Sequence, residues 1–227
     1  MKAVFLFDTT GYAAAPFTKR GWDTTIVDTQ NIGALAENPR ATHVLDWDIL
    51  EREKELVSLC RGASFVFGFP PCTDLAASGA RHFRNKSLDN PDFQLDAVEL
   101  ARSVERIADS ANVAWALENP IGSLGTLWRR ADRKFHPYEY GGYLPDDDEH
   151  PEYPKYILAR DAYEKTTQIW HSFDFVWPPT NPVELVTITY SAQHHKLGGK
   201  SAKTKRIRSA SPRGFFEGLA RAYCNEL

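Results

Sequence analysis

Two residues of this chain have the chemistry of a covalent catalyst, Cys72 and Glu118. Cys72 follows two prolines, which restrict the backbone and so fix the direction of the thiol. A thiol attacks carbon only as its thiolate, so a site that uses it needs a nearby base or a lowered pKa. Glu118 ends the next predicted strand, where a carboxyl group can hand over a proton as Cys72 attacks. A lone cysteine is more often a small buried hydrophobe, and this alternative stays open here.

Acidic residues at the other predicted strand ends have the chemistry of a cofactor site. Asp8 and Gly11 follow the first strand, Asp28 the second, and Asp46 and Asp48 the third. Gly11 lets the backbone approach a cofactor closely, and Asp28, 17 residues further on, is spaced to hold both hydroxyls of a ribose. A turn cap is the alternative role for Asp28. One glycine makes a poor phosphate cradle, so a cofactor without a pyrophosphate suits this loop better.

The elements that must position these side chains alternate along the first half of the chain. We predict a doubly wound α/β fold with a mostly parallel sheet, because strand patterns alternate with helical ones. The predicted strands cover residues 2–8, 24–28, 42–46, 63–67 and 113–117, and the predicted helices cover 13–20, 49–61 and 93–111. In such sheets ligands bind outside the carboxyl ends of the strands. The reactive side chains should therefore converge at one edge.

The second half of the chain has a looser pattern. Residues 135–154 are rich in Pro, Gly, Tyr and acids, which predicts a long surface loop. Strand-like stretches return at 167–170 and 183–190, and a last helix, capped by Ser211 with Pro212 at its first position, runs to the C-terminus. We divide this single compact domain into a catalytic and cofactor-binding core (1–133), a loop-rich insertion (134–211) and a C-terminal helix packing on the core (212–227).

Composition limits the classes of protein that the chain can belong to. Its 227 residues fit one α/β domain, and its net charge of −3 means that any affinity for nucleic acid must be local. Three scattered cysteines make no disulfide framework, and no apolar run reaches the roughly 18 residues of a membrane span. We expect a cytoplasmic protein without a membrane partner. No metal site is predicted, since His194-His195 lacks spaced Cys or carboxylate partners.

Basic residues gather in one segment, 191–213, which holds seven Lys or Arg and no acid. Such a segment can pair with the phosphates of a nucleic acid. Gly198-Gly199 predicts that it is mobile until bound. A solvated charged loop is the alternative. The residues expected to contact DNA are Lys200, Lys203, Lys205, Arg206 and Arg208 of this segment, together with Lys165.

Short motifs in the first 125 or so residues resemble those of the DNA cytosine-C5 methyltransferases. The run Gly68-Phe69-Pro70-Pro71-Cys72 resembles their Pro-Cys nucleophile loop, and Glu118-Asn119-Pro120 resembles their Glu-Asn-Val motif, in the expected order. Residues 7–21 match the first motif of the family in length, with Phe7 and Gly11 in place. Asp48-Ile49 resembles the Asp-Ile pair that contacts the adenine ring. The chain looks like a small, phage-type member.

The resemblance implies a class I S-adenosylmethionine-dependent methyltransferase that acts on a cytosine swung out of the DNA helix. Cys72 then adds to C6 and Glu118 stabilises the ring protonated at N3, so that C5 takes the methyl group from S-adenosylmethionine. By the same resemblance, the catalytic residues are Cys72, Glu118, Asn119 and Pro71. The residues that bind the cofactor are then Phe7, Asp8, Gly11, Asp28, Asp48, Ile49, Phe69 and Pro70.

The chain also departs from the family. Thr9 stands where a first glycine is usual, and the arginine that contacts the cytosine O2 is missing; Lys165, Arg206 or Arg208 can substitute for it. The target-recognition region is reduced, which leaves two alternatives within the same chemistry. These are a cytosine in tRNA or a free nucleotide as the substrate, and transfer of a group other than methyl. A catalytically inactive nucleic-acid-binding module with the same fold is the alternative from another class.

Overall fold

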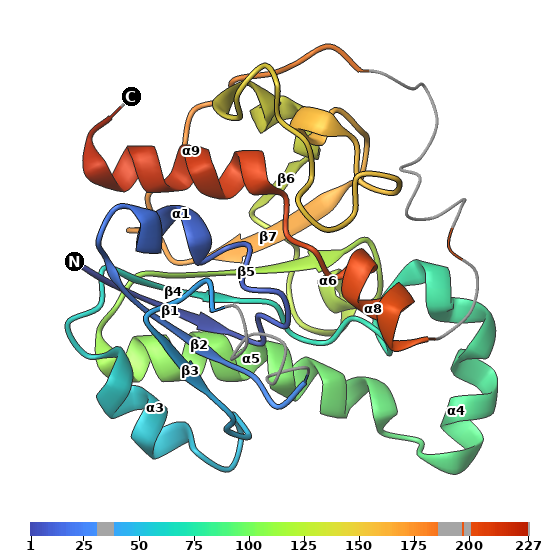
Figure 1. Cartoon of the computed structure of the whole chain (residues 1–227). Coiled ribbons are helices and arrows are strands. Elements are labelled where there is room, and N and C mark those ends of the chain that lie inside the picture. The colour runs from blue at the N-terminus through green and yellow to red at the C-terminus, as the bar shows by residue number, and fades with distance from the viewer. Residues whose placement is uncertain (31–38, 186–196, 198–200, 227) are drawn as a thin grey trace.

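A seven-stranded sheet forms the centre of the protein (Figure 1). The computed structural model describes residues 1–30, 39–185, 197 and 201–226. Lys200, His194-His195 and Gly198-Gly199 therefore lie outside the described residues. In sheet order the strands are β3 (His43–Leu45), β2 (Asp23–Val27), β1 (Lys2–Leu6), β4 (Phe65–Gly68), β5 (Trp115–Pro120), β7 (Thr167–His171) and β6 (Arg133–Phe135).

The sheet is mostly parallel. The five strands from β1 to β5 run in one direction, whereas β7 is antiparallel to both of its neighbours, β5 and β6. The predicted mixed α/β fold with a mostly parallel sheet is confirmed. The order reverses between β1 and β4, since the chain builds outward through β2 and β3 on one side and through β5 on the other. Such a reversal is where parallel sheets bind ligands.

Helices cover both faces of the sheet (Figure 1). One face packs on α3 (Glu53–Cys60) and α5 (Phe93–Ala111), and the other packs on α1 (Ala15–Lys19) and α9 (Arg213–Cys224). Side chains of β1 alternate between the two faces, as the two-residue period of a strand requires. Val4 and Leu6 join the core under α5, while Phe5 joins the aromatic core under α9.

The long helix α5 was predicted with its observed bounds, because its apolar residues recur at helical spacing. It packs tightly on β4, where a Cβ added to Gly68 would lie 2.5 Å from the side chain of Val104. Strand β5, in contrast, runs three residues past the predicted end at residue 117. Its parallel neighbour β4 pairs only up to Leu117, but antiparallel β7 continues the pairing as far as Pro120.

The prediction of a long surface loop at 135–154 was wrong in its first part. Phe135 belongs to β6, and the short helix η2 (Pro137–Tyr143) follows it. Tyr140 and Tyr143 are buried beneath α9. The two glycines of α9 permit this close packing, since a Cβ on Gly214 would lie 2.5 Å from the Tyr140 carbonyl oxygen. The tyrosines of this stretch are typical of a buried core, but its Pro and Gly residues favoured the prediction of a loop.

The basic segment and the last helix also differ from their predictions. Residues 202–208 form helix α8 (Ala202–Arg208), which Ser201 caps by accepting a hydrogen bond from the Thr204 N–H. Helix α9 has Pro212 as its N-cap, so the predicted cap, Ser211, stands one residue too early. Residues 183–185 are not in a strand, and the rest of the strand predicted at 183–190 lies outside the described residues.

The remaining elements are short. Helices η1 (Ala77–His82) and α4 (Phe83–Asp89) follow the loop after β4, helix α6 (Leu124–Leu127) follows β5, and η3 (Ala159–Asp161) precedes β7. Within the described residues, no helix is both long and apolar enough to cross a bilayer.

Candidate active site

The loops after β1 and β4 leave the sheet side by side at its point of reversal. Leu6 pairs with Gly68, and the Phe69 N–H donates to the Leu6 carbonyl at 2.9 Å. The β1 loop carries the acids predicted to serve a cofactor, and the β4 loop carries Cys72. The topology therefore places both groups at one edge, as the sequence predicts.

Cys72 is held by its own loop and by β5. It is exposed, and its carbonyl accepts hydrogen bonds from the Leu75 and Ala76 N–H groups at 3.1 and 2.8 Å, which closes a tight turn. Buried Asn119 donates from Nδ2 to the Pro70 carbonyl at 3.0 Å. The side chain next to Glu118 in β5 thus fixes the proline pair that aims the thiol.

A second set of backbone contacts binds the same two segments further along. Ala76 and Gly122 form an antiparallel bridge, and the Ala77 N–H donates to the Ile121 carbonyl at 2.9 Å. Gly122 is required here, because a Cβ would lie 2.0 Å from the Leu75 carbonyl oxygen. The Cys72 turn is therefore attached to β5 on both sides, which sets the position of the thiol relative to Glu118.

Four groups interact electrostatically around this turn. Although Cys72 is exposed on one side, the protein around it desolvates the thiol and raises its pKa, and the charge of Glu118 raises that pKa further. Lys165 and Arg208 oppose this rise. Burial raises the pKa of Glu118 as well, again against the influence of Lys165. The lysine, whose Nζ donates to the Arg208 carbonyl at 3.1 Å, therefore acts on both candidate catalytic groups.

These shifts decide what each group can do. A thiol with a raised pKa is neutral near neutral pH, so its activation depends on nearby positive charge. A carboxyl group with a raised pKa keeps its proton to a higher pH than an exposed one, which makes it a better proton donor to a base. The pair thus consists of a thiol that needs activation and a carboxyl group that can exchange a proton with a ligand.

A cavity of about 160 Å³ lies beside the thiol turn. Four of the predicted cofactor residues line it, together with Pro71, the neighbour of Cys72, and four residues that sequence reasoning missed. The first four are Phe7, Asp28, Asp48 and Ile49, and the missed ones are Thr29, Gln30, Trp47 and Leu100. Trp47 directly precedes Asp48-Ile49 and could have been found with that motif, whereas Leu100 comes from distant α5 without any local signal.

Asp28 is buried at the wall of this cavity. Its carboxylate accepts a hydrogen bond from Thr9 Oγ1 at 2.9 Å and one from the Gln30 N–H at 2.6 Å. Burial, with the charge of Asp46 adding to it, raises the pKa of Asp28. The Thr9 hydroxyl thus orients this carboxylate, a contact that a residue without a side-chain donor could not make.

Asp8 supports the loop after β1 from its buried side. It is only 2% exposed, and its Oδ1 accepts from the N–H groups of Gly11 at 2.8 Å and Thr10 at 3.2 Å. Its Oδ2 is buried without a hydrogen-bond partner, and burial raises the pKa of Asp8 to about 6. Phe7 and Gly11 adopt positive φ angles of 60° and 71°, which turn the chain sharply around this carboxyl group. Asp8 and Gly11 therefore form the loop without lining the cavity.

The other predicted cofactor residues differ in whether they line the cavity. Asp48 lines the cavity and also accepts hydrogen bonds from the Leu50 and Glu51 N–H groups. The ring of Phe69 packs against Phe67 and Phe216 in the core under α9, and Phe69 does not line the cavity. Pro70 gives its carbonyl to Asn119 and does not line the cavity.

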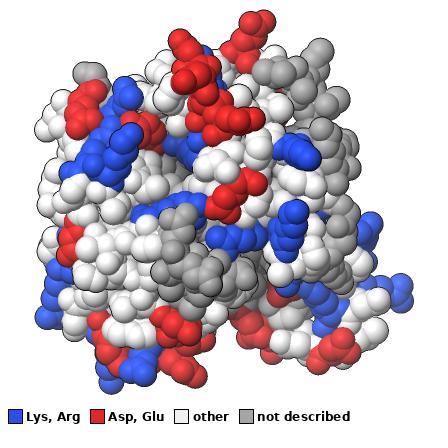
Figure 2. Space-filling model, in the orientation of Figure 1, with Lys and Arg blue, Asp and Glu red and all other residues white. Residues whose placement is uncertain are grey.

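Helix α8 brings basic side chains to the site. Lys203, Lys205 and Arg208 are exposed, and Arg208 influences the pKa of Cys72. In Figure 2, Lys and Arg side chains lie over the region where Figure 1 places α8. Arg206 is less accessible: its side chain is only 17% exposed and its Nε donates to the Tyr153 hydroxyl at 3.1 Å.

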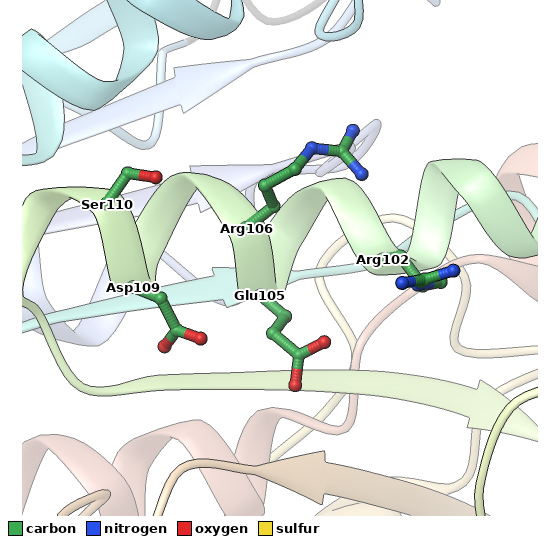
Figure 3. Close-up of a pocket in the computed structure, with 5 residues that line it drawn as sticks. All are labelled: Arg102, Glu105, Arg106, Asp109 and Ser110. Carbon is green, nitrogen blue, oxygen red and sulfur yellow. The ribbon is translucent and has the colours of Figure 1, made fainter.

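A second hollow, of about 270 Å³, lies on α5 (Figure 3). Its lining is charged, with Arg102, Glu105, Arg106, Asp109 and Ser110 along one helix. Arg106 is bound by Glu99 and Glu53, and Asp109 accepts from the Trp115 indole at 3.0 Å. These groups serve packing at the end of α5 that precedes β5, far along the strands from Cys72.

Comparison with known proteins adds no family: no protein-family model matches the chain, and no curated protein matches it. Among the described residues, no group of three or more His, Cys, Asp or Glu side chains is placed to hold a metal ion. The chemistry of the site must therefore be inferred from the thiol turn, the acid on β5 and the adjoining cavity.

Proposed function

We propose that this protein is a small, phage-type DNA cytosine-C5 methyltransferase that uses S-adenosylmethionine. One observation carries the proposal: Cys72 and Glu118 are fixed together at the sheet edge, next to a cavity that Pro71 and Asp28 help to line. A thiol beside a carboxyl group whose pKa is raised suits addition to a pyrimidine ring. The strand order, with antiparallel β7 between β5 and β6, agrees with the class I methyltransferase type.

The cavity residues fit the adenosyl part of this cofactor. Phe7, Trp47 and Ile49 offer apolar and aromatic surface to a purine ring, and Asp28 offers a carboxylate to ribose hydroxyls. When bound, S-adenosylmethionine supplies an electrophilic methyl group on its sulfonium.

The protein's own residues would supply the rest of the reaction. The Cys72 thiol loses its proton to solvent, its Sγ forms a bond to C6 of cytosine, and N3 takes the proton of Glu118. This leaves electron density at C5, which becomes nucleophilic. After C5 is methylated, loss of its proton to solvent returns the electrons to the ring, the Sγ–C6 bond breaks, and N3 gives its proton back to Glu118.

Lys165 is the best replacement for the missing arginine at the cytosine O2. It influences both Cys72 and Glu118, whereas the guanidinium of Arg206 is engaged with Tyr153. Exposed Lys203, Lys205 and Arg208 would pair with phosphates beside a base that has left the stack. Lys200, the remaining predicted contact, lies outside the described residues.

Transfer of labelled methyl from S-adenosylmethionine tests the proposal. Wild-type protein should label cytosine C5 in duplex DNA, and Cys72→Ser should reduce the rate by at least about 1,000-fold, because the ring is not activated without the thiol. Cys224→Ser is the matched control, since Cys224 is the other partly exposed cysteine, and its rate should stay within about twofold.

Two other results would overturn the proposal in different ways. Label found only in tRNA or in dCMP would keep the chemistry and change the substrate. No label in DNA, tRNA or dCMP, from folded protein that binds DNA, would identify an inactive binding module.

A further inference from the structure

Arg40 clamps the loop that carries the cofactor acids. Arg40 lies shortly before β3 in the chain, and its Nη1 donates a hydrogen bond to the Thr10 carbonyl at 3.1 Å. Its guanidinium also sits over the ring of Tyr12, 4.3 Å from the ring centre. With a side chain only 14% exposed, Arg40 is fixed on two sides against the turn that Asp8 and Gly11 form.

Glu152 holds the other side of this arginine. Its carboxylate pairs with Arg40, and the hydroxyls of Tyr12 and Tyr153 also hydrogen-bond to it. Partial burial pushes the pKa of Glu152 upward, but these hydroxyls and the charge of Arg40 bring it below its usual value. The carboxylate is therefore ionised and strongly bound at neutral pH.

The same carboxylate reaches helix α8. Arg206 Nε donates to the Tyr153 hydroxyl and lies 4.0 Å from Glu152 Oε2. Buried Ile207 anchors the helix beside this contact. One glutamate thus lies between the arginine that contacts the cofactor loop and an arginine of the basic helix, and each arginine comes from a different part of the chain.

We infer that Glu152 and Arg40 are positioning residues that couple the cofactor loop to the nucleic-acid-binding helix. This inference rests on the proposed function, in which α8 meets DNA and the β1 loop meets the cofactor. A ligand that fixes α8 fixes Arg206 and Glu152, and so orders Arg40 and the Thr10 carbonyl before the cofactor arrives. Each ligand then tightens the binding of the other by the same factor, since coupling is reciprocal.

The chain offers a matched ion pair that lacks this connection. Arg20 and Glu217 join α1 to α9 at 2.6 Å, with side chains 16% and 18% exposed. Arg20 also bonds Pro16 and Glu226, all of them on the C-terminal helix side of the sheet. Removing this pair should cost comparable stability and leave the coupling intact.

Calorimetric titration tests the inference with S-adenosylmethionine, alone and with saturating duplex DNA, and with DNA in the reverse order. In wild-type protein each ligand should lower the Kd of the other by about fivefold or more. Glu152→Gln should reduce that factor to less than about twofold while DNA still binds, because the amide cannot hold both arginines. Glu217→Gln should retain the wild-type factor.

Arg40→Lys provides a second variant should Glu152→Gln fail to fold. Lysine keeps the charge, but it lacks the planar fork that reaches both Thr10 and Glu152, so the coupling should fall here as well. A wild-type factor near one, or an unchanged factor in both variants, would overturn the inference while leaving the proposed function in place. Wild-type protein that binds neither ligand would overturn both.

Discussion

Two groups of acidic residues differ in whether a cation pairs with them, and the difference distinguishes acids that support the fold from acids that can serve a ligand. Beneath α9, Asp148 pairs with Arg213 through two hydrogen bonds, at 2.7 and 2.6 Å. At the sheet edge, Asp8 and Asp28 are bound by backbone N–H groups and threonine hydroxyls instead. Across the described part of the chain, neither Asp8 nor Asp28 has an ion pair within 4.0 Å.

The pKa values follow this difference. Burial alone would raise the pKa of Asp148, but Arg213 holds it below its usual value. The neighbouring Asp161 shares that guanidinium, and its deeper burial still raises its pKa to about 6. Asp8 reaches about 6 with an oxygen that has no partner. A buried acid with a cation supports the fold, whereas a buried acid without one at a cavity wall, as Asp28 is, is available to a ligand.

Removal of the cation should have the largest effect on stability. Arg213→Met leaves the Asp148 carboxylate without its ion-pair partner and removes the charge that lowers the pKa of buried Asp161, so we expect a loss of about 3–5 kcal/mol in the free energy of unfolding. Urea denaturation measures this. Arg130→Met removes an exposed arginine and should stay within about 0.5 kcal/mol of wild type. A loss below about 1 kcal/mol for Arg213→Met would contradict the claim that the acid paired with a cation supports the fold.

Replacing Asp8 by a neutral residue should increase the stability of the folded protein, which is the opposite of the effect expected at Arg213. An acid whose pKa is raised from 3.8 to about 6 on folding destabilises the folded protein above that pH, and the penalty disappears as the pH falls below 3.8. Asp8→Asn keeps the Oδ1 acceptor, so it should gain about 1–3 kcal/mol near pH 8 and no more than about 0.5 kcal/mol near pH 4. Its affinity for S-adenosylmethionine should stay within about twofold of wild type, because Asp8 supports the loop and does not line the cavity.

Denaturation at several pH values, with cofactor titration alongside, checks this pair of effects. A variant that is less stable than wild type at the higher pH would show that the ionised carboxylate supports the fold, as Asp148 does.

The smallest expected effect concerns the thiol itself. The charge of Glu118 raises the pKa of Cys72 and Lys165 lowers it. In a Cys224→Ser background, Glu118→Gln should therefore speed alkylation by iodoacetamide about threefold near pH 8, and Lys165→Met should slow it by a similar factor. The expected order of rates is Glu118→Gln, then the parent, then Lys165→Met. Identical rates in all three proteins would mean that these charges do not act on the thiol.

Local patterns predicted most of the parallel half of the molecule. Helix α5 and strands β1 to β4 follow from apolar spacing and from the residues that end each element. Residues that depend on pairing with distant segments were mispredicted. Strand β5 continues through Glu118 because β7, about fifty residues later, pairs with it. The core at Tyr140 escaped notice because the glycines that admit α9 resemble a loop signal.

The candidate site divides in the same way. Short motifs contain the residues predicted to react or to bind the cofactor, and the residue types in these motifs indicate their chemistry. These residues are Cys72, Glu118, Asp28 and Asp48. The residues that position them carry no such signal. Arg40 and Glu152 are 112 positions apart in the chain, and a lone arginine or glutamate reads as surface until the fold brings the two together.

The central claim, that Cys72 attacks C6 of cytosine beside Glu118, is tested most directly with duplex DNA containing 5-fluorocytosine. Fluorine at C5 cannot leave as the proton does, so the Sγ–C6 bond persists after methylation. Mass spectrometry of wild-type protein incubated with this DNA and S-adenosylmethionine should show a covalent complex whose cross-linked peptide contains Cys72. A complex that forms equally well with Cys72→Ser, or the absence of any complex from protein that binds both ligands, would contradict the claim.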